Sequence, residues 1–294
     1  MVEMITVFWK EIADHFNSKR FLILLILVFA VGVFSIYIDA QYIRAAVSDT
    51  RFVFLKLYTT SGQGFPLFIF FIAFFMPIVG IALGFDAINS EKNNGTLSRL
   101  MAQPIYRDAV INGKFLAGLV TIAIMLTSLV MLVAGVGLWM IGVPPSSEEV
   151  ARLITFLAIS IVYGAFWLAL AMMFSIFLLK VATSALSAIA IWILFIFMFG
   201  SPIALGQLGL TALIIMQVSP IAIFFEVISI LLEPGARTMM QLFQGGAAGV
   251  PTSALSLSQS LIIILPHLVS LIGLTVICFA ISYIRFMREE IRST

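Results

Sequence analysis

Long apolar runs without charged residues alternate with short polar segments along the whole chain. A helix of roughly 20 apolar residues crosses the ~30 Å hydrocarbon layer of a bilayer, and each run is long enough to do so. The runs cover Phe21 to Ile38, Phe65 to Phe85, Phe115 to Val143, Leu153 to Leu179, Val181 to about Leu205, and Leu261 to Ile284. The alternating pattern of barrel strands is absent. The sequence therefore predicts an all-α integral membrane protein with six transmembrane helices, in a single domain over residues 1–294.

The segment before the first run, residues 1–20, has the spacing of an amphipathic helix. Bulky apolar side chains recur at helical intervals on one side, and most polar side chains lie away from them. The apolar set is Ile5, Phe8, Trp9, Ile12 and Phe16, and the polar set is Lys10, Glu11, Asp14 and Asn17. We therefore expect an interfacial helix on the membrane surface. It either anchors the first span or acts as a lever toward a partner.

The distribution of positive charge predicts the orientation of the chain. Cytoplasmic loops of membrane proteins are enriched in Lys and Arg. With both termini cytoplasmic, most of the 16 Lys and Arg residues lie on the cytoplasmic side, and Arg152 is one of the few outside. The predicted location is the plasma (cell) membrane, which the chain crosses several times.

One region leaves the number of spans open, because residues 181–225 carry no charge and are long enough for two helices. A seventh span would move the C-terminal arginines to the outside, against the charge bias. We therefore predict one span, interrupted near Gly200, Pro202 and Gly206. An external or re-entrant region, residues 206–260, follows it before the last span.

Polar residues, which are scarce elsewhere, concentrate in the loop of residues 87–113 between the second and third runs. The Asn93–Gly95 segment interrupts the second helix, and Thr96 can cap a new one. A short helix over about residues 97–102 results. Its apolar side chains are Leu97, Leu100 and Met101. We expect this apolar side to be exposed and to fold back on the membrane or fit a groove on another protein.

The intervals in this loop resemble those of ABC-2-type permeases. The matching positions are Glu91, Gly95-Thr96-Leu97, Leu100, Pro104, Arg107 and Gly113-Lys114, together with Trp9-Lys10-Glu11 before the first span. The six-span layout extends the resemblance over almost the whole chain. Within the family, the chain is most similar to the branch containing the permease of the nitrous-oxide reductase maturation system. Arg99 and Gln103 depart from the pattern, which leaves the choice of ATPase partner open.

The resemblance implies that the chain is the transmembrane permease subunit of an ABC exporter. The loop would be a coupling helix that docks on a separate cytoplasmic ATPase subunit, which binds ATP and magnesium. The coupling residues would be Glu91, Gly95, Thr96, Leu97, Leu100, Pro104 and Arg107, assisted by Trp9, Lys10 and Glu11. A second permease chain, identical or different, would complete a dimer. No cofactor is expected in this chain.

The chain carries no sequence signature of an enzyme. A G-x-x-x-x-G-K-[ST] motif is absent, because Gly113-Lys114 is followed by Phe115 and lacks the earlier glycine. Lys114 is better explained as a residue that begins the third span and extends its ammonium to the interface. For His267, a structural hydrogen bond to a neighbouring helix is the preferred interpretation over a role as a ligand. Cys278 is the only cysteine, so neither a disulfide within the chain nor a cysteine metal site is expected.

Two other classes of function are also disfavoured. The net charge of +2 and the lack of a basic run argue against nucleic acid as a partner. Secondary transporters keep ionisable residues inside their spans, where this chain has almost none. Glu226 and Glu233 are better explained by a helix on the external surface. An ATP-independent membrane channel or scaffold remains the alternative, and the sequence does not indicate a substrate.

Overall fold

The computed structural model describes residues 2–45, 52, 54–59, 67–97, 105–205, 218–234 and 255–288. These residues form α1 (Val2–Asn17), α2 (Lys19–Ala45), α3 (Lys56–Thr59), α4 (Leu67–Gly84), α5 (Asn89–Asn93), α7 (Arg107–Ile141), α8 (Ser147–Phe177), α9 (Val181–Leu205), α11 (Pro220–Leu232) and α13 (Leu257–Arg288). None of them forms a strand. The prediction of an all-α chain is confirmed.

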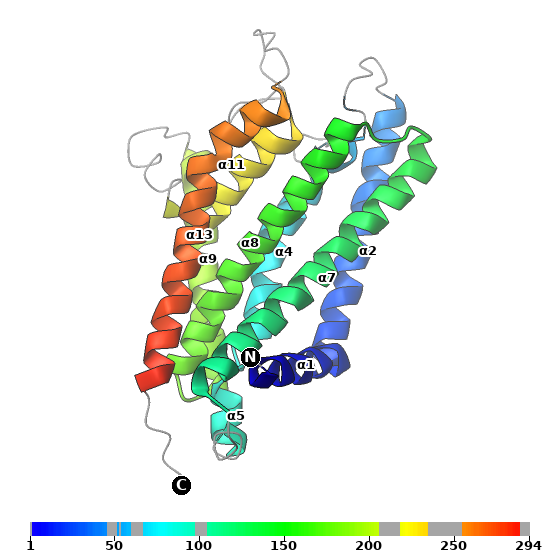
Figure 1. The fold of residues 1–294 in the computed structure, drawn as a ribbon. Coiled ribbons are helices and arrows are strands. Elements are labelled where there is room, and N and C mark those ends of the chain that lie inside the picture. The colour runs from blue at the N-terminus through cyan, green and yellow to red at the C-terminus, as the bar shows by residue number, and fades with distance from the viewer. Residues whose placement is uncertain are drawn as a thin grey trace.

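Six of the described helices, α2, α4, α7, α8, α9 and α13, are long and apolar enough to cross a membrane. They lie side by side as a bundle (Figure 1), and successive spans run in opposite directions. The first and last described residues, Val2 and Arg288, lie at the same end, where α1 and α5 also lie. We call this end the α1 end and the opposite one the far end. The prediction of six spans is confirmed.

The uncharged region that was long enough for one span or two contains one long helix and one short helix. α9 is a span, whereas α11 has 13 residues and is too short to cross a bilayer as a helix. The interruption predicted near Gly200 and Pro202 is wrong, because α9 continues through both residues to Leu205. Membrane helices tolerate proline where neighbouring groups satisfy the freed backbone. Gly206 lies outside the described residues.

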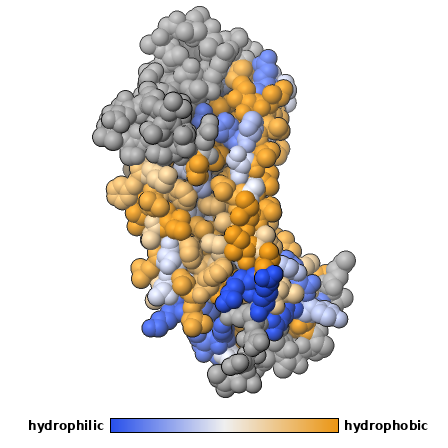
Figure 2. Space-filling view, turned by 90° about the vertical axis from the view of Figure 1, so that its left-hand side faces the viewer, coloured by the Kyte–Doolittle hydropathy of each residue, from blue (hydrophilic) through white to orange (hydrophobic). Residues whose placement is uncertain are grey.

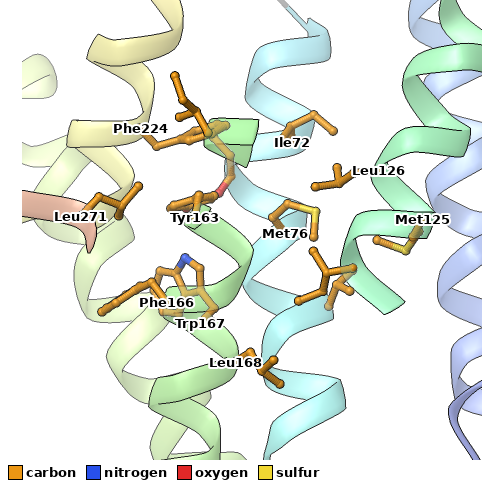
Figure 3. Close-up of a cluster of buried hydrophobic side chains, with 14 of the residues drawn as sticks. Ile72, Met76, Met125, Leu126, Tyr163, Phe166, Trp167, Leu168, Phe224 and Leu271 are labelled. Carbon is orange, nitrogen blue, oxygen red and sulfur yellow. The ribbon is translucent and has the colours of Figure 1, made fainter. Parts of the chain in front are cut away.

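α8 is the central helix of the bundle. It packs against α4, α7, α9, α11 and α13, and every position from Tyr163 to Met172 is buried. Figure 3 shows Tyr163 and Trp167 of α8 between side chains of α4, α7, α11 and α13. The Tyr163 ring stacks on Phe224 of α11 with centroids 4.2 Å apart. A helix that is apolar on all sides is stable only when other helices or lipid surround it.

Small residues allow α4 to approach α8 closely, as is common between membrane helices. A Cβ at Gly84 would lie 2.8 Å from Ala171 Cβ and 2.9 Å from the Leu168 carbonyl oxygen. We expect Gly84→Leu to destabilise the bundle by at least about 1–3 kcal/mol through overpacking. Thermal unfolding in detergent measures this. Gly135→Leu is the matched control, because a Cβ at Gly135 meets nothing within 4 Å, and equal melting of the two variants would contradict the prediction.

α11 is buried within the far half of the bundle, beside α13 and also against α4 and α8. Every residue of this helix is buried except Glu226, which is partly exposed. The prediction of a surface helix for this stretch is therefore wrong. Its continuous apolar sequence fits burial on all sides, and a helix lying on a surface would need a polar face.

The surface of the bundle has the polarity expected of a membrane protein. Figure 2 shows an apolar band across the middle of one face and hydrophilic residues at the α1 end. On α2, α9 and α13, large apolar side chains such as Phe34, Phe197 and Ile262 are exposed. Contact with lipid or with another membrane chain would satisfy these faces.

Candidate functional site

α1 lies across the ends of α2 and α7. It turns Val7 and Glu11 inward and leaves Trp9, Ile5 and Phe16 exposed. Gly113 of α7 makes this contact possible, because a Cβ there would lie 3.0 Å from a Val7 methyl group and 3.2 Å from the Met4 carbonyl oxygen. The amphipathic spacing of residues 1–20 thus corresponds to a helix with one buried and one exposed side. Its position on a membrane surface remains a prediction.

Four charged side chains from α1, α5 and α7 lie in contact with one another, and we call them the charge cluster: Lys10, Glu11, Glu91 and Lys114. Lys10 Nζ lies 2.9 Å from a Glu11 carboxylate oxygen and 3.0 Å from one of Glu91. Lys114 Nζ lies 2.8 Å and 3.0 Å from the same two oxygens. The cluster therefore joins α1, α5 and α7. The prediction that Lys114 extends to the interface is wrong, because its side chain is only 4% exposed and pairs with both carboxylates.

The electrostatics of the cluster favour its ionised form. Burial alone would raise the pKa of Glu11, but the ammonium groups of Lys114 and Lys10 outweigh it and hold this pKa below 4.5. Burial alone would lower the pKa of Lys10, but the Glu11 and Glu91 carboxylates raise it above its ordinary value. A depressed carboxyl pKa stabilises the fold above the unfolded-state value. The contribution of Glu11 is thus complete near neutral pH and declines as the pH falls below about 4.5.

α5 is fixed to the end of α8 by hydrogen bonds. The Ser175 hydroxyl oxygen of α8 accepts from the backbone N–H groups of Ile88 and Asn89, at 2.9 and 3.1 Å. The Asn89 amide donates to the Leu178 carbonyl oxygen at 3.3 Å, and the Asn93 amide donates to that of Leu179 at 2.9 Å. The loop predicted to couple to a partner is therefore bonded to α8 as well as to the charge cluster.

The chain turns after α5 at two of the predicted coupling residues. Gly95 has a φ of +68°, in the left-handed region that favours glycine. The Thr96 hydroxyl donates to the Glu91 carbonyl oxygen at 3.1 Å. The predicted break at Gly95 is thus a tight turn, although α4 itself ends earlier, at Gly84. Leu100, Met101 and Pro104 lie outside the described residues.

Arg107 lies at the start of α7 and connects it to the last span. Its guanidinium donates to the Met287 carbonyl oxygen of α13 at 3.4 Å. Of the residues selected from the sequence, Lys10, Glu11 and Glu91 therefore meet in one cluster. Arg107 contacts α13 instead, and Trp9 faces outward, 63% exposed.

Leu97 differs from its predicted role as part of an exposed docking face, because it is only 2% exposed. An amphipathic pattern identifies the apolar side of a helix but not whether its own chain covers that side. We expect Leu97→Asp to cost about 3 kcal/mol or more, because it buries an unpaired charge. Denaturant unfolding in detergent measures the loss. Thr96→Asp is the control, since Thr96 is exposed, and equal stability of the two variants would contradict the buried position of Leu97.

Among the described residues of the far end, Arg152 of α8 makes the most side-chain hydrogen bonds, and it is fully buried. Its guanidinium donates to the carbonyl oxygens of Leu231 and Leu255, both at 2.6 Å. It also donates to the Ser260 hydroxyl oxygen at 3.3 Å and to a Glu148 carboxylate oxygen at 2.9 Å. Arg152 thus connects α8 to the end of α11 and the start of α13.

Glu149, three residues before Arg152, makes a parallel set of contacts. It closes a capping box with Ser146 at the start of α8. One of its oxygens accepts from the backbone N–H groups of Phe54 and Leu55, at 2.9 and 3.3 Å. The first turn of α8 therefore holds the segment before α3, while Arg152 holds α11 and α13. The sequence indicates Arg152 only as a charge that bears on the orientation of the chain.

His267 of α13 lies near an ionisable side chain of α11, Glu226. Its Nε2 atom is 3.9 Å from a Glu226 carboxylate oxygen, which is too long for a hydrogen bond. Its buried Nδ1 atom has no hydrogen-bond partner among the described residues. The predicted structural hydrogen bond of His267 is therefore not found there. Among the described residues, no group of three or more His, Cys, Asp or Glu could hold a metal ion.

The matching family model and two similar proteins all bear the name of an ABC transporter. The family model described as ABC-2 family transporter protein matches residues 5–291. A relative from Pseudomonas aeruginosa, named as a probable ABC transporter permease protein NosY, is 27% identical over 198 residues. That match covers 66% of this chain and 67% of the relative. The protein of the same name from Stutzerimonas stutzeri is 27% identical over 202 residues, or 65% of each chain.

Proposed function

Because the chain belongs to the ABC-2 transporter family, we propose that it is the membrane subunit of an ABC exporter. It couples ATP hydrolysis by a separate nucleotide-binding subunit to movement of a substrate across the plasma membrane. The observation that carries this proposal is the charge cluster, in which Lys114 and Lys10 connect α1 and α7 to Glu91 of α5. A partner that moves α5 would therefore act on α1 and α7 at the same time.

The contacts of α5 also support a path by which a movement of α5 reaches the far end of the bundle. Ser175 bonds to the start of α5, and Arg152 of the same helix holds α11 and α13. These two residues are separated by roughly 35 Å of helix at 1.5 Å per residue. Since α8 is unbroken between them and continuously buried from Tyr163 to Met172, a displacement of α5 is carried as a movement of the whole helix. We propose that α8 transmits the action of the ATPase to the far end.

The remaining parts of the transporter follow from the same proposal. ATP and magnesium bind to the partner ATPase, and a second permease chain, identical or different, completes the membrane part. The α1 end and both termini are cytoplasmic, so that α5 faces the partner. This orientation agrees with the excess of Lys and Arg on that side. An ATP-independent channel or scaffold would share the six spans but would have no use for a coupling loop.

Affinity purification of the tagged chain from its native host in mild detergent tests the proposal. We expect a stoichiometric second subunit that carries the G-x-x-x-x-G-K-[ST] phosphate-binding motif. Its ATP hydrolysis should increase when the permease is present in the same vesicles. Absence of such a subunit, repeated after crosslinking in intact membranes, would contradict the proposal and favour the ATP-independent alternative.

A further inference from the structure

A cavity of about 290 Å³ lies beside the charge cluster, between the α1–α2 junction and the end of α4. Its wall combines charged and apolar side chains. The charged ones are Glu11, Asp14, Arg20, Asp86, Glu91 and Lys114, and the apolar ones include Phe21, Leu24 and Leu83. At ~30 Å³ per water, the volume equals about ten water molecules, which is also enough for a small polar headgroup.

The cavity lies where the apolar surface of the spans begins. In α2, the charged Lys19 and Arg20 are followed, after the buried Phe21, by the exposed apolar residues Leu22, Ile23 and Ile26. In α4, the apolar helix is followed after one turn residue by a carboxylate. Such a boundary between charged and apolar surface coincides with the lipid headgroups of a bilayer. A lipid with its headgroup in the cavity would lay its acyl chains along the exposed side of α2.

The charges in the cavity favour a cationic headgroup. Carboxylates outnumber the Lys and Arg side chains in its wall, and burial lowers the pKa of His15, so it adds no charge near neutral pH. Glu11 and Glu91 pair with lysines, and Asp86 pairs with Arg20 at 2.5 Å. Asp14 is different: it is largely exposed, and its ion pair with Lys10 is long, at 3.6 Å.

We propose that this cavity binds the ammonium headgroup of an aminophospholipid, such as phosphatidylethanolamine, from the leaflet that faces α1. The Asp14 carboxylate accepts hydrogen bonds from the ammonium group. A primary ammonium has three N–H donors for such contacts, whereas the methylated ammonium of phosphatidylcholine has none and is larger. This binding concerns the chain alone and does not depend on the proposed ATPase partner.

The test counts lipids bound to the purified 294-residue chain by native mass spectrometry. Dioctanoyl-phosphatidylethanolamine and dioctanoyl-phosphatidylcholine are titrated in parallel. We expect one bound phosphatidylethanolamine per chain, preferred by roughly tenfold over phosphatidylcholine. Asp14→Asn should weaken binding roughly three- to tenfold, and Ala87→Leu, which fills the cavity, should abolish it. Asp108→Asn is the matched control, because Asp108 is an exposed carboxylate that does not line the cavity.

Three results would overturn the proposal. Equal binding of the two lipids would show that the ammonium is not recognised. Unchanged binding in Asp14→Asn and Ala87→Leu, with both variants folded by their melting curves, would place the lipid elsewhere. Binding of free phosphoethanolamine as tightly as the lipid would assign the cavity to a soluble amine.

Discussion

Replacing Lys114 with methionine should lower the stability of the chain by about 3–5 kcal/mol, because a buried ion pair is broken from one side. The Lys114 ammonium lies within 3.0 Å of both Glu11 and Glu91. The second carboxylate oxygen of Glu91 is buried without a hydrogen-bond partner among the described residues. Lys10 alone would then have to neutralise two carboxylates. Chemical unfolding in detergent measures the change, and hydrogen exchange in α1 should increase.

Two further variants make this prediction specific. Lys180→Met removes an exposed lysine at the same end of the bundle, and it should change the stability by less than about 0.5 kcal/mol. Adding Glu11→Gln to Lys114→Met leaves Lys10 with one carboxylate to neutralise instead of two and should recover part of the loss. If Lys114→Met were as stable as Lys180→Met, the charge cluster would not be what holds α1 to the bundle.

The second large effect is expected at the far end, where Arg152→Met should cost about 3–5 kcal/mol. The substitution removes the donors for two backbone carbonyl groups, a hydroxyl and a carboxylate. Buried acceptors left without donors cost roughly 1–3 kcal/mol each. We also expect α11 to become accessible to proteases, since Arg152 bonds its end at Leu231. Denaturant unfolding and limited proteolysis measure the two effects.

Arg288→Met serves as the control for Arg152, because Arg288 is exposed at the end of α13. Arg152→Lys is also informative: a lysine keeps the charge but cannot reproduce the planar set of donors. The stability of Arg152→Lys should therefore lie between that of Arg152→Met and that of the wild type. Wild-type stability of Arg152→Met would show that the buried contacts of this arginine are not needed to hold α11 and α13.

The spans could be predicted from the sequence because their signal is local. A run of uncharged apolar residues requires a helix wherever lipid surrounds it, so each of the six runs corresponds to a helix. The start of α8 was not predicted, because the apolar run begins only at Leu153, whereas the helix begins at Ser147 after the N-cap Ser146. The burial of α11 was not predicted, because its continuous apolar sequence fits several surroundings.

The contacts of the site depend on how separate helices lie against each other, and one sequence does not contain that information. The resemblance to a family selected Lys10, Glu11 and Glu91, but it did not show that Lys114 joins them. That pairing requires α1 to lie against Gly113 of α7. The partners of Arg152 include backbone carbonyl groups. Every residue has such a group, so the sequence does not show which of them Arg152 bonds.

Photocrosslinking in intact cells tests the central claim, that an ATPase acts on the chain at α5. A photoreactive amino acid is placed at Asn94, which is exposed directly after α5, and separately at Trp139, which is 85% exposed near the far end of α7. The account predicts a crosslink from position 94, but not from position 139, to a subunit with the phosphate-binding motif. A crosslink to that subunit only from position 139, or no crosslink from position 94, would contradict it.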